Sequence, residues 1–231
     1  FFFTQTPESA ILSGLVGSEM CIRDSGKSTL LNGLPPYLQG GSWTCLPEPV
    51  NHPEFKKRLE EFYIDQNKRI ELHDWIVKDR LRETLSLKKD QHYISERSFI
   101  GDMVFAYANI MSHERPGGQY MDLLYQSIEH GLHFPLDAVV YLEASPSACM
   151  KRIKARSRKA EENISLSYIQ YLHNCYQTHL PEICNRFKIP MIRIDWNEFR
   201  STDYIAQCIH STLGITSPDT AQGQPLLRAV S

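Results

Sequence analysis

Long apolar runs are missing from this chain of 231 residues. The segments closest to one, such as 137–143, are no longer than a strand, whereas a membrane-spanning helix needs about 20 mainly apolar residues. A basic excess is missing too, because the formal net charge is −2 and the pI is near 6.5. Without that excess the chain is poorly suited to neutralise a nucleic-acid backbone. We therefore predict a soluble protein that binds neither a membrane nor a nucleic acid.

Paired cysteines are also missing, although the chain has six cysteines in total. They lie far apart and form no Cys-x-x-Cys pair, which argues against a structural zinc site and against a small disulfide scaffold. This spacing favours a reducing compartment, the cytoplasm or the mitochondrion. The six are Cys21, Cys45, Cys149, Cys175, Cys184 and Cys208.

Helical and strand patterns alternate along most of the chain, which is typical of an α/β domain with a mainly parallel sheet. Apolar residues recur at three- and four-residue spacing over Ser167–Phe187, and this predicts a helix with one buried face. Short strands bounded by polar or proline-containing segments are predicted at Ser42–Leu46, His92–Glu96, Val139–Glu143 and Met191–Asp195.

The two ends of the chain differ from this pattern. Residues 1–25 offer no clean strand, and the stretch Val16–Ser25 resembles a translated sequencing adapter, so we assign the folded domain to 26–215. On this interpretation the true first strand and half of a phosphate loop are missing. Residues 216–231 lose periodicity and predict a disordered tail.

A partial phosphate-binding motif begins the domain. Gly26-Lys27-Ser28 is the second half of GxxxxGK[ST], in which backbone N–H groups through Thr29 hold phosphate oxygens, the lysine reaches the transferred phosphate and the serine binds Mg²⁺. The first glycine is expected at position 21, where this chain has Cys21, whose Cβ resists positive φ. The alternative is an ordinary glycine-capped helix start.

Two glutamates end predicted strands. Glu48 stands in Leu-Pro-Glu-Pro-Val, and Glu96 precedes Arg97 in Tyr-Ile-Ser-Glu-Arg-Ser. Ligands bind outside the carboxyl ends of strands in open α/β sheets, and a carboxylate there can act as a general base. The alternatives are a turn glutamate held between two prolines and a surface Glu–Arg pair, which contributes little.

A basic cluster follows the third predicted strand. Arg152 and Arg156 lie one helical turn apart and share a face, with Arg158 just beyond them. Guanidinium groups that converge can stabilise a transferring phosphoryl group. The alternative is a solvated basic helix face.

Together these motifs, in this order, resemble the deoxynucleoside kinase family from Gly26 to about Leu213. The resemblance implies a P-loop NTPase-type three-layer fold with a five-stranded parallel sheet, helices on both faces and a small lid. It implies transfer of the γ-phosphate of ATP to the 5′-hydroxyl of a deoxynucleoside in nucleotide salvage, with Mg²⁺ as cofactor and a homodimer as the assembly.

The resemblance also implies roles around the reacting phosphate. Glu48 takes the proton from the 5′-hydroxyl, while Lys27 and Arg97 stabilise the charge on the phosphoryl group. Ser28 and Glu96 hold Mg²⁺. Three lid arginines close over the ATP phosphates, namely Arg152, Arg156 and Arg158.

The implied nucleoside pocket contains one departure from the family pattern. His73 stands where most members carry a glutamine that binds the base edge, so a helix histidine facing solvent is an open alternative. Arg80 and Asp102 match a pair that favours deoxycytidine or a deoxypurine over thymidine, and Phe105 lies one position nearer Asp102 than in the best-known members. The sugar 3′-hydroxyl is assigned to Tyr63 and Glu161.

Two other functions remain open. A nucleoside monophosphate kinase would bind an acceptor that already carries a phosphate, whereas Tyr63 and Glu161 fit a neutral nucleoside better. A non-catalytic, kinase-like subunit of a mitochondrial complex would share the fold, but the retained Lys27, Glu48 and Arg97 favour activity.

Overall fold

The computed structural model describes residues 11–17, 26–38, 42–49, 52–88, 91–111, 126, 136–156 and 164–214. Its strands form one five-stranded sheet of order β2-β3-β1-β4-β5, in which every neighbouring pair is parallel. The predicted α/β class is therefore confirmed. The strands are β1 (Ile11–Gly17), β2 (Trp43–Leu46), β3 (His92–Ser95), β4 (Ala138–Glu143) and β5 (Met191–Asp195).

The four strands expected from sequence are all present. β5 coincides with its prediction, and β2, β3 and β4 each differ from theirs by one residue at one end. β4 is buried over Ala138–Leu142 because it lies between two other strands and helices cover its faces. Its continuous apolar sequence is the pattern expected of such a strand.

The expectation that no strand precedes Gly26 is wrong. β1 occupies the centre of the sheet, where Ile11 aligns with Tyr93 of β3 and Leu12 with Ala138 of β4. Its register shifts between Ser13 and Leu15, around a glycine. Glycine and serine are poor strand formers, but pairing with two buried neighbours overrides that preference. The adapter-like stretch was bounded at Val16–Ser25, but Val16 and Gly17 end β1, and residues 18–25 lie outside the described part of the chain.

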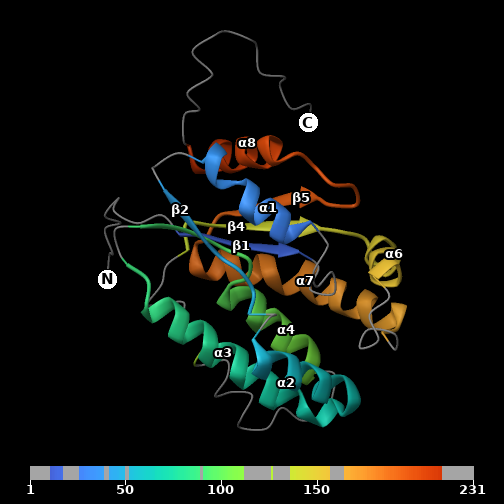
Figure 1. Ribbon diagram of the computed structural model, residues 1–231. Helices are drawn as coiled ribbons and strands as arrows, with labels where there is room; N and C mark the ends of the chain where they lie inside the picture. The colour runs from blue at the N-terminus through green and yellow to red at the C-terminus, as the bar shows by residue number, and fades with distance from the viewer. Residues whose placement is uncertain are drawn as a thin grey trace.

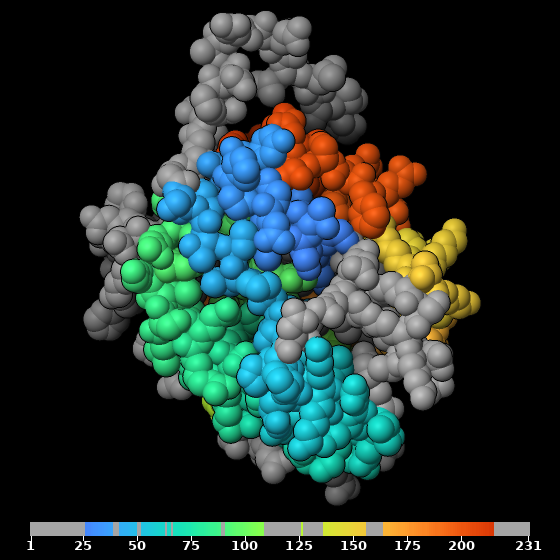
Figure 2. All heavy atoms as spheres, viewed as in Figure 1, coloured from blue at the N-terminus to red at the C-terminus, as the bar shows by residue number. Residues whose placement is uncertain are grey.

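Helices lie on both sides of the sheet (Figure 1). α1 and α8 cover one face, while α4 and α7 cover the other, and α3 and α2 pack in turn outside α4. The space-filling view shows α1 and α8 adjacent on one surface, with α2 and α3 below them on the same face (Figure 2). The helices are α1 (Lys27–Gly33), α2 (Pro53–Ile64), α3 (Arg69–Leu85), α4 (Phe99–Met111), α6 (Pro146–Arg156), α7 (Leu166–Phe187) and α8 (Thr202–Leu213), with short 3-10 turns η1 (Pro35–Tyr37) and η2 (Gln66–Lys68).

The predicted long helix is confirmed as α7, which starts one residue before the predicted bound. Ser165 caps it by accepting a hydrogen bond from the Tyr168 N–H at 3.1 Å, and Lys188 ends it with a left-handed φ of 57°. The apolar stripe lies against α4 and the sheet, so it belongs to the core. Its buried members include Ile169, Leu172, Tyr176 and Leu180.

No helix in the described residues is long and apolar enough to cross a membrane. The predicted tail, 216–231, lies outside the described part of the chain.

Candidate active site

The ends of β2 and β3 meet the start of α1 at one buried carboxylate. Glu96 is 4% exposed, and it accepts a hydrogen bond from Ser28 Oγ at 3.2 Å and another from the Glu48 N–H at 3.2 Å. The Glu96 N–H donates in turn to the Leu46 carbonyl, which continues the pairing of the two strands beyond their ends. Strand pairing therefore brings together three residues that are far apart in sequence.

Glu48 forms an ion pair with Arg97 beside this carboxylate. Arg97 Nε lies 2.7 Å from Glu48 Oε1, and their side chains are 9% and 7% exposed. The Arg97 carbonyl also accepts a hydrogen bond from Arg80 Nη1 at 3.0 Å. Little solvent screens this pair, so Arg97 fixes the position of the Glu48 carboxylate.

Gly26 caps the start of α1, and Lys27 is the first residue of that helix. Gly26 has a φ of 79°, a backbone conformation that favours glycine, and a Cβ at this position would come within 3.0 Å of the Phe199 ring. Lys27 is buried at the start of α1, and Thr29 is exposed. Cys21 lies outside the described residues.

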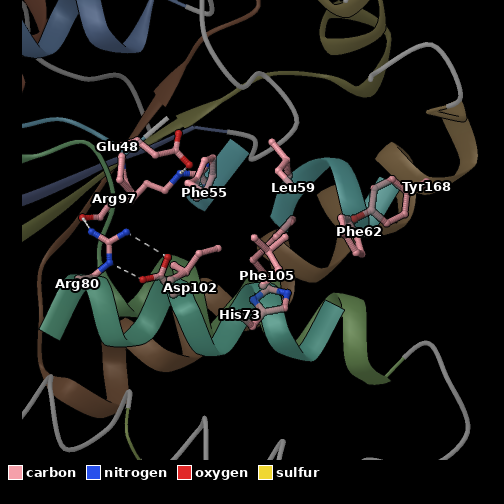
Figure 3. Close-up of a pocket in the computed structure, with 13 residues that line it drawn as sticks. Glu48, Phe55, Leu59, Phe62, His73, Arg80, Arg97, Asp102, Phe105 and Tyr168 are labelled. Carbon is pink, nitrogen blue, oxygen red and sulfur yellow. Dashed lines mark hydrogen bonds and ion pairs between the residues drawn. The ribbon is translucent and has the colours of Figure 1, made fainter. Parts of the chain in front are cut away.

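A pocket adjoins the Glu48–Arg97 pair (Figure 3). It lies between α2, α3 and α4, and Tyr168 at the start of α7 contributes to its far side. Its polar groups come mainly from strand ends and from α3 and α4, whereas α2 supplies apolar side chains. The lining residues are Glu48, Pro49, Phe55, Leu59, Phe62, Leu72, His73, Ile76, Arg80, Arg97, Asp102, Phe105 and Tyr168.

Arg80 and Asp102 form the ion pair that the sequence predicted. Arg80 Nε contacts Asp102 Oδ2, and Arg80 Nη2 donates to Asp102 Oδ1 at 3.3 Å. Burial by itself would lower the pKa of Arg80, but the charge and the hydrogen bond of Asp102 raise it above its usual range. The pair joins α3 to α4 and presents both charges to the pocket.

His73 faces the pocket, and the alternative of a solvent-facing helix histidine is wrong. Its side chain is 1% exposed, and its ring lies 5.0 Å from that of Phe105. Burial lowers the pKa of His73 to about 4, although nearby Asp102 partly opposes this effect. The imidazole is therefore neutral at physiological pH.

The lid region is only partly described. Arg152 Nη2 donates to the carbonyls of Trp196 at 2.7 Å and Asn197 at 3.0 Å, and its guanidinium lies 4.7 Å from the Phe199 ring centroid. Arg152 thus contacts the segment after β5, and the sequence alone did not predict this contact. Arg156 closes α6.

Several predicted residues cannot be placed as side chains. The side chains of Tyr63 in α2 and Arg156 in α6 lie outside what the structure describes. Arg158 and Glu161 lie outside the described residues altogether. Their roles stay predictions.

Sequence reasoning missed the apolar wall of the pocket. Phe55, Leu59 and Phe62 recur at four- and three-residue spacing along α2, a signal that indicates a buried face without showing what that face encloses. Tyr168 and Phe199 carried no motif that could have identified them.

Comparisons with known proteins identify the family of this chain. The family described as deoxynucleoside kinase matches residues 22–211. A deoxyadenosine kinase of Dictyostelium discoideum is 30% identical over 203 residues, covering 86% of this chain and 76% of the relative. Human deoxycytidine kinase is 26% identical over 211 residues, covering 75% of this chain and 80% of that protein.

Solved structures show the same fold. The structure of deoxyadenosine kinase from M. mycoides with bound dCTP aligns with a TM-score of 0.65 at 22% identity, covering 89% of this chain and 98% of that one. The family match covers most of the chain, and a relative that is 30% identical bears a name from the same family. The chain therefore belongs to the deoxynucleoside kinase family.

Proposed function

We propose that this protein transfers the γ-phosphate of ATP to the 5′-hydroxyl of a deoxynucleoside. The observation that carries the proposal is the Glu48–Arg97 pair. This pair lies between the pocket and Glu96, which accepts a hydrogen bond from Ser28 at the start of α1. A base at that boundary can reach both a hydroxyl in the pocket and a phosphate on the loop. Family membership supports a nucleoside kinase in general, and the site supports this more specific reaction.

In the proposed reaction Glu48 accepts the 5′-hydroxyl proton as the hydroxyl oxygen forms its bond to the γ-phosphorus. The bond from that phosphorus to the bridging oxygen breaks, and ADP leaves. Arg97 stays beside Glu48, orients its carboxylate and stabilises charge on the transferring group. No covalent enzyme intermediate is needed.

Ser28 and Glu96 fit the role of holding Mg²⁺. Their facing oxygens, Ser28 Oγ and Glu96 Oε1, are 3.2 Å apart. Adjacent octahedral ligands at Mg²⁺ distances lie about 2.9 Å from each other, and such sites take few protein ligands because phosphates and waters supply the rest. Bound Mg²⁺ neutralises charge on the β- and γ-phosphates.

Other proposed contacts complete the site. Lys27 and the N–H groups from Gly26 to Thr29 bind ATP phosphates. Arg152, Arg156 and Arg158 serve as the lid, and Tyr63 with Glu161 binds the sugar 3′-hydroxyl. Family resemblance further supports a homodimer that acts in nucleotide salvage.

The Arg80–Asp102 pair supports a preference for deoxycytidine or a deoxypurine. Held together, the two side chains present a donor and an acceptor to the base, and they occupy the space that a thymine methyl group would need. We therefore propose that thymidine is the poorer substrate.

Steady-state ATP turnover with a panel of deoxynucleosides and their 5′-monophosphates tests the proposal. Turnover should require a deoxynucleoside, and Glu48→Gln should abolish most of it while Glu60→Gln, the same change at an exposed position of α2, leaves it intact. Turnover with monophosphates alone would indicate a nucleoside monophosphate kinase. No turnover with any acceptor would indicate a non-catalytic subunit.

A further inference from the structure

The segment after β5, residues 196–199, lies against the start of α1. A Cβ at Gly26, the residue that caps α1, would come within 3.0 Å of the Phe199 ring and 3.3 Å of the Trp196 ring. The two rings also meet edge to face, with their centroids 5.6 Å apart. Trp196 is buried in the core, so this segment has a fixed place beside the start of α1.

The same segment holds helix α6 at two points. The N–H of Ser145, the residue before α6, donates to Asn197 Oδ1 at 2.9 Å. Further along α6, Arg152 Nη2 donates to the carbonyls of Trp196 at 2.7 Å and Asn197 at 3.0 Å. Both α6 and this segment lie at the carboxyl end of the sheet (Figure 1). Because α6 packs against α7 and α1 packs against β1 and η1, residues 196–199 connect two elements from different parts of the fold.

Hydrogen bonds, rather than packing, fix the side chain of Asn197. The residue is exposed, and its Nδ2 donates to Asp195 Oδ1 at 2.7 Å. The Asn197 N–H donates to the same oxygen at 2.9 Å, and these two bonds lower the pKa of Asp195, so its carboxylate stays ionised. With its amide nitrogen bonded to Asp195, Asn197 directs its amide oxygen to Ser145.

A local turn accounts for only part of this arrangement. The bond from the Asn197 N–H to the Asp195 carboxylate closes a common Asx turn, whereas the bond from Ser145 joins residues 52 apart in sequence. An asparagine that serves only a turn needs no such distant partner. The arrangement therefore indicates that Asn197 determines where α6 begins.

Arg152 gives the position of α6 a functional consequence. Its Nη2 is bonded to backbone carbonyls, while its Nη1 is buried and has no hydrogen-bond partner among the described residues. A buried donor without a partner is costly, so Nη1 is suited to bind a ligand. Under the proposed function that ligand is a phosphate of ATP, which Lys27 of α1 also binds.

We propose that Asn197 is a positioning residue, which holds α6 and its Arg152 at the distance from Lys27 that phosphoryl transfer needs. The inference rests on the proposed function, because it assumes that α1 and α6 bind the phosphates of ATP together. Groups on two elements stabilise one transferring phosphoryl group only while their separation is fixed, and a displacement of about 1 Å can lower a rate about 100-fold. Asn197 acts through Arg152 rather than by touching ATP.

Asn197→Leu tests the proposal, because leucine has a similar size but neither hydrogen-bonding atom. We expect this variant to bind a non-hydrolysable ATP analogue with Mg²⁺ about tenfold more weakly in calorimetry, the usual effect of losing a hydrogen bond to a charged group. It should lower kcat/KM for ATP by about 10- to 100-fold. KM for the deoxynucleoside should stay within about twofold of the parent value, because residue 197 does not line the pocket. Thermal unfolding should change little, since Asn197 is exposed.

Two further substitutions separate positioning from a general loss of structure. Asn174→Leu is the matched control, since Asn174 is exposed on α7 and accepts a hydrogen bond from Gln170 at 3.0 Å. It should change neither analogue binding nor turnover. Asn197→Asp places a second carboxylate beside Asp195 and should weaken analogue binding, whereas adding Asp195→Asn again pairs an amide with a carboxylate and should restore that binding.

Parental affinity for the analogue in Asn197→Leu, or equal losses for ATP and the deoxynucleoside, would overturn the inference and leave Asn197 a turn residue. If Asn197→Leu does not fold, Asn197→Asp and the double variant decide, and equal affinities of those two for the analogue would overturn the inference. Analogue binding by a parent protein that transfers no phosphate would refute the proposed function. Weaker analogue binding by Asn197→Leu would in that case still support the inference.

Discussion

The groups at the strand ends and the groups in the adjoining pocket are held in different ways. Ser28, Glu48 and Glu96 are joined by hydrogen bonds, and Arg97 pairs with Glu48, so each of these side chains has a fixed neighbour. The pocket beyond them is lined by helix faces, and His73 keeps an unpartnered nitrogen there among the described residues. On the proposed function, we expect the first region to set the rate of phosphoryl transfer and the second to set the choice of substrate.

This comparison predicts that substitutions at the strand ends change rate, while substitutions in the pocket change substrate choice and stability. The first kind should leave the order of substrates unaltered. The second kind should leave a working phosphoryl-transfer site.

The largest effect is expected from Glu48→Gln. The amide cannot accept the proton, and loss of a general base typically lowers kcat by about 10² to 10⁴. ATP affinity, measured by calorimetry, should stay close to that of the parent, because the change is isosteric and Glu48 does not belong to the phosphate loop. A variant with parental kcat at neutral pH would show that Glu48 is only a turn residue.

Breaking the Arg80–Asp102 pair should have the next largest effect. Asp102→Ala alone leaves a buried arginine without its carboxylate and should destabilise the fold by about 3–5 kcal/mol in denaturant unfolding. Combining Asp102→Ala with Arg80→Met should recover much of the lost stability. The double substitution should also reduce or reverse the preference for deoxycytidine or a deoxypurine over thymidine.

The exposed pair of Arg82 and Asp79 on α3 supplies the control for that experiment. Arg82→Met with Asp79→Ala should change stability by less than about 1 kcal/mol and leave the substrate order unaltered. If the parent protein preferred thymidine over every other deoxynucleoside, this would contradict the assignment of Arg80 and Asp102 to the selection of the base.

The pH dependence of stability tests the buried state of His73. Its folded pKa of about 4 lies below the ordinary 6.5, so the unfolded chain binds a proton that the folded chain does not. Stability should therefore fall as the pH drops from 6.5 towards 4, by about 3 kcal/mol in all from this residue. Urea unfolding at several pH values should show this slope reduced in His73→Gln, and an unchanged slope would mean that His73 is exposed.

A smaller effect is expected at position 21. The GxxxxGK[ST] pattern has glycine at this position, and positive φ at a residue with a Cβ typically costs about 1–3 kcal/mol, so we expect the substitution of Cys21 by glycine to favour phosphate binding. Cys21→Gly should therefore tighten ATP binding about tenfold in calorimetry, while Cys208→Gly on α8 should bring no such gain. Equal ATP affinity of Cys21→Gly and the parent chain would contradict the view that this loop is damaged.

The sequence indicated that two strand-end carboxylates lie close together because Glu48 and Glu96 each stand just beyond a predicted strand. Glu48 is the second residue after β2 and Glu96 is the first after β3, so parallel pairing places them together. Strand β1 was missed because Ser13, Gly14 and Gly17 interrupt its apolar residues, and pairing with β3 and β4 decides its conformation.

The pocket was less predictable for a different reason. The inward orientation of His73 depends on how α3 packs against α4, and no local pattern encodes that packing. The Arg152 contacts with Trp196 and Asn197 join segments more than 40 residues apart. Tertiary arrangement, rather than propensity, sets these positions.

The most direct test follows the γ-phosphate itself. The parent protein is incubated with γ-³²P-labelled ATP, Mg²⁺ and deoxyadenosine or deoxycytidine, and the products are separated and treated with a nucleotidase specific for 5′-monophosphates. The account predicts that label appears in the deoxynucleoside monophosphate, is released by the nucleotidase and is nearly absent with Glu48→Gln. Label found only in inorganic phosphate, or equal labelling by Glu48→Gln, would contradict it.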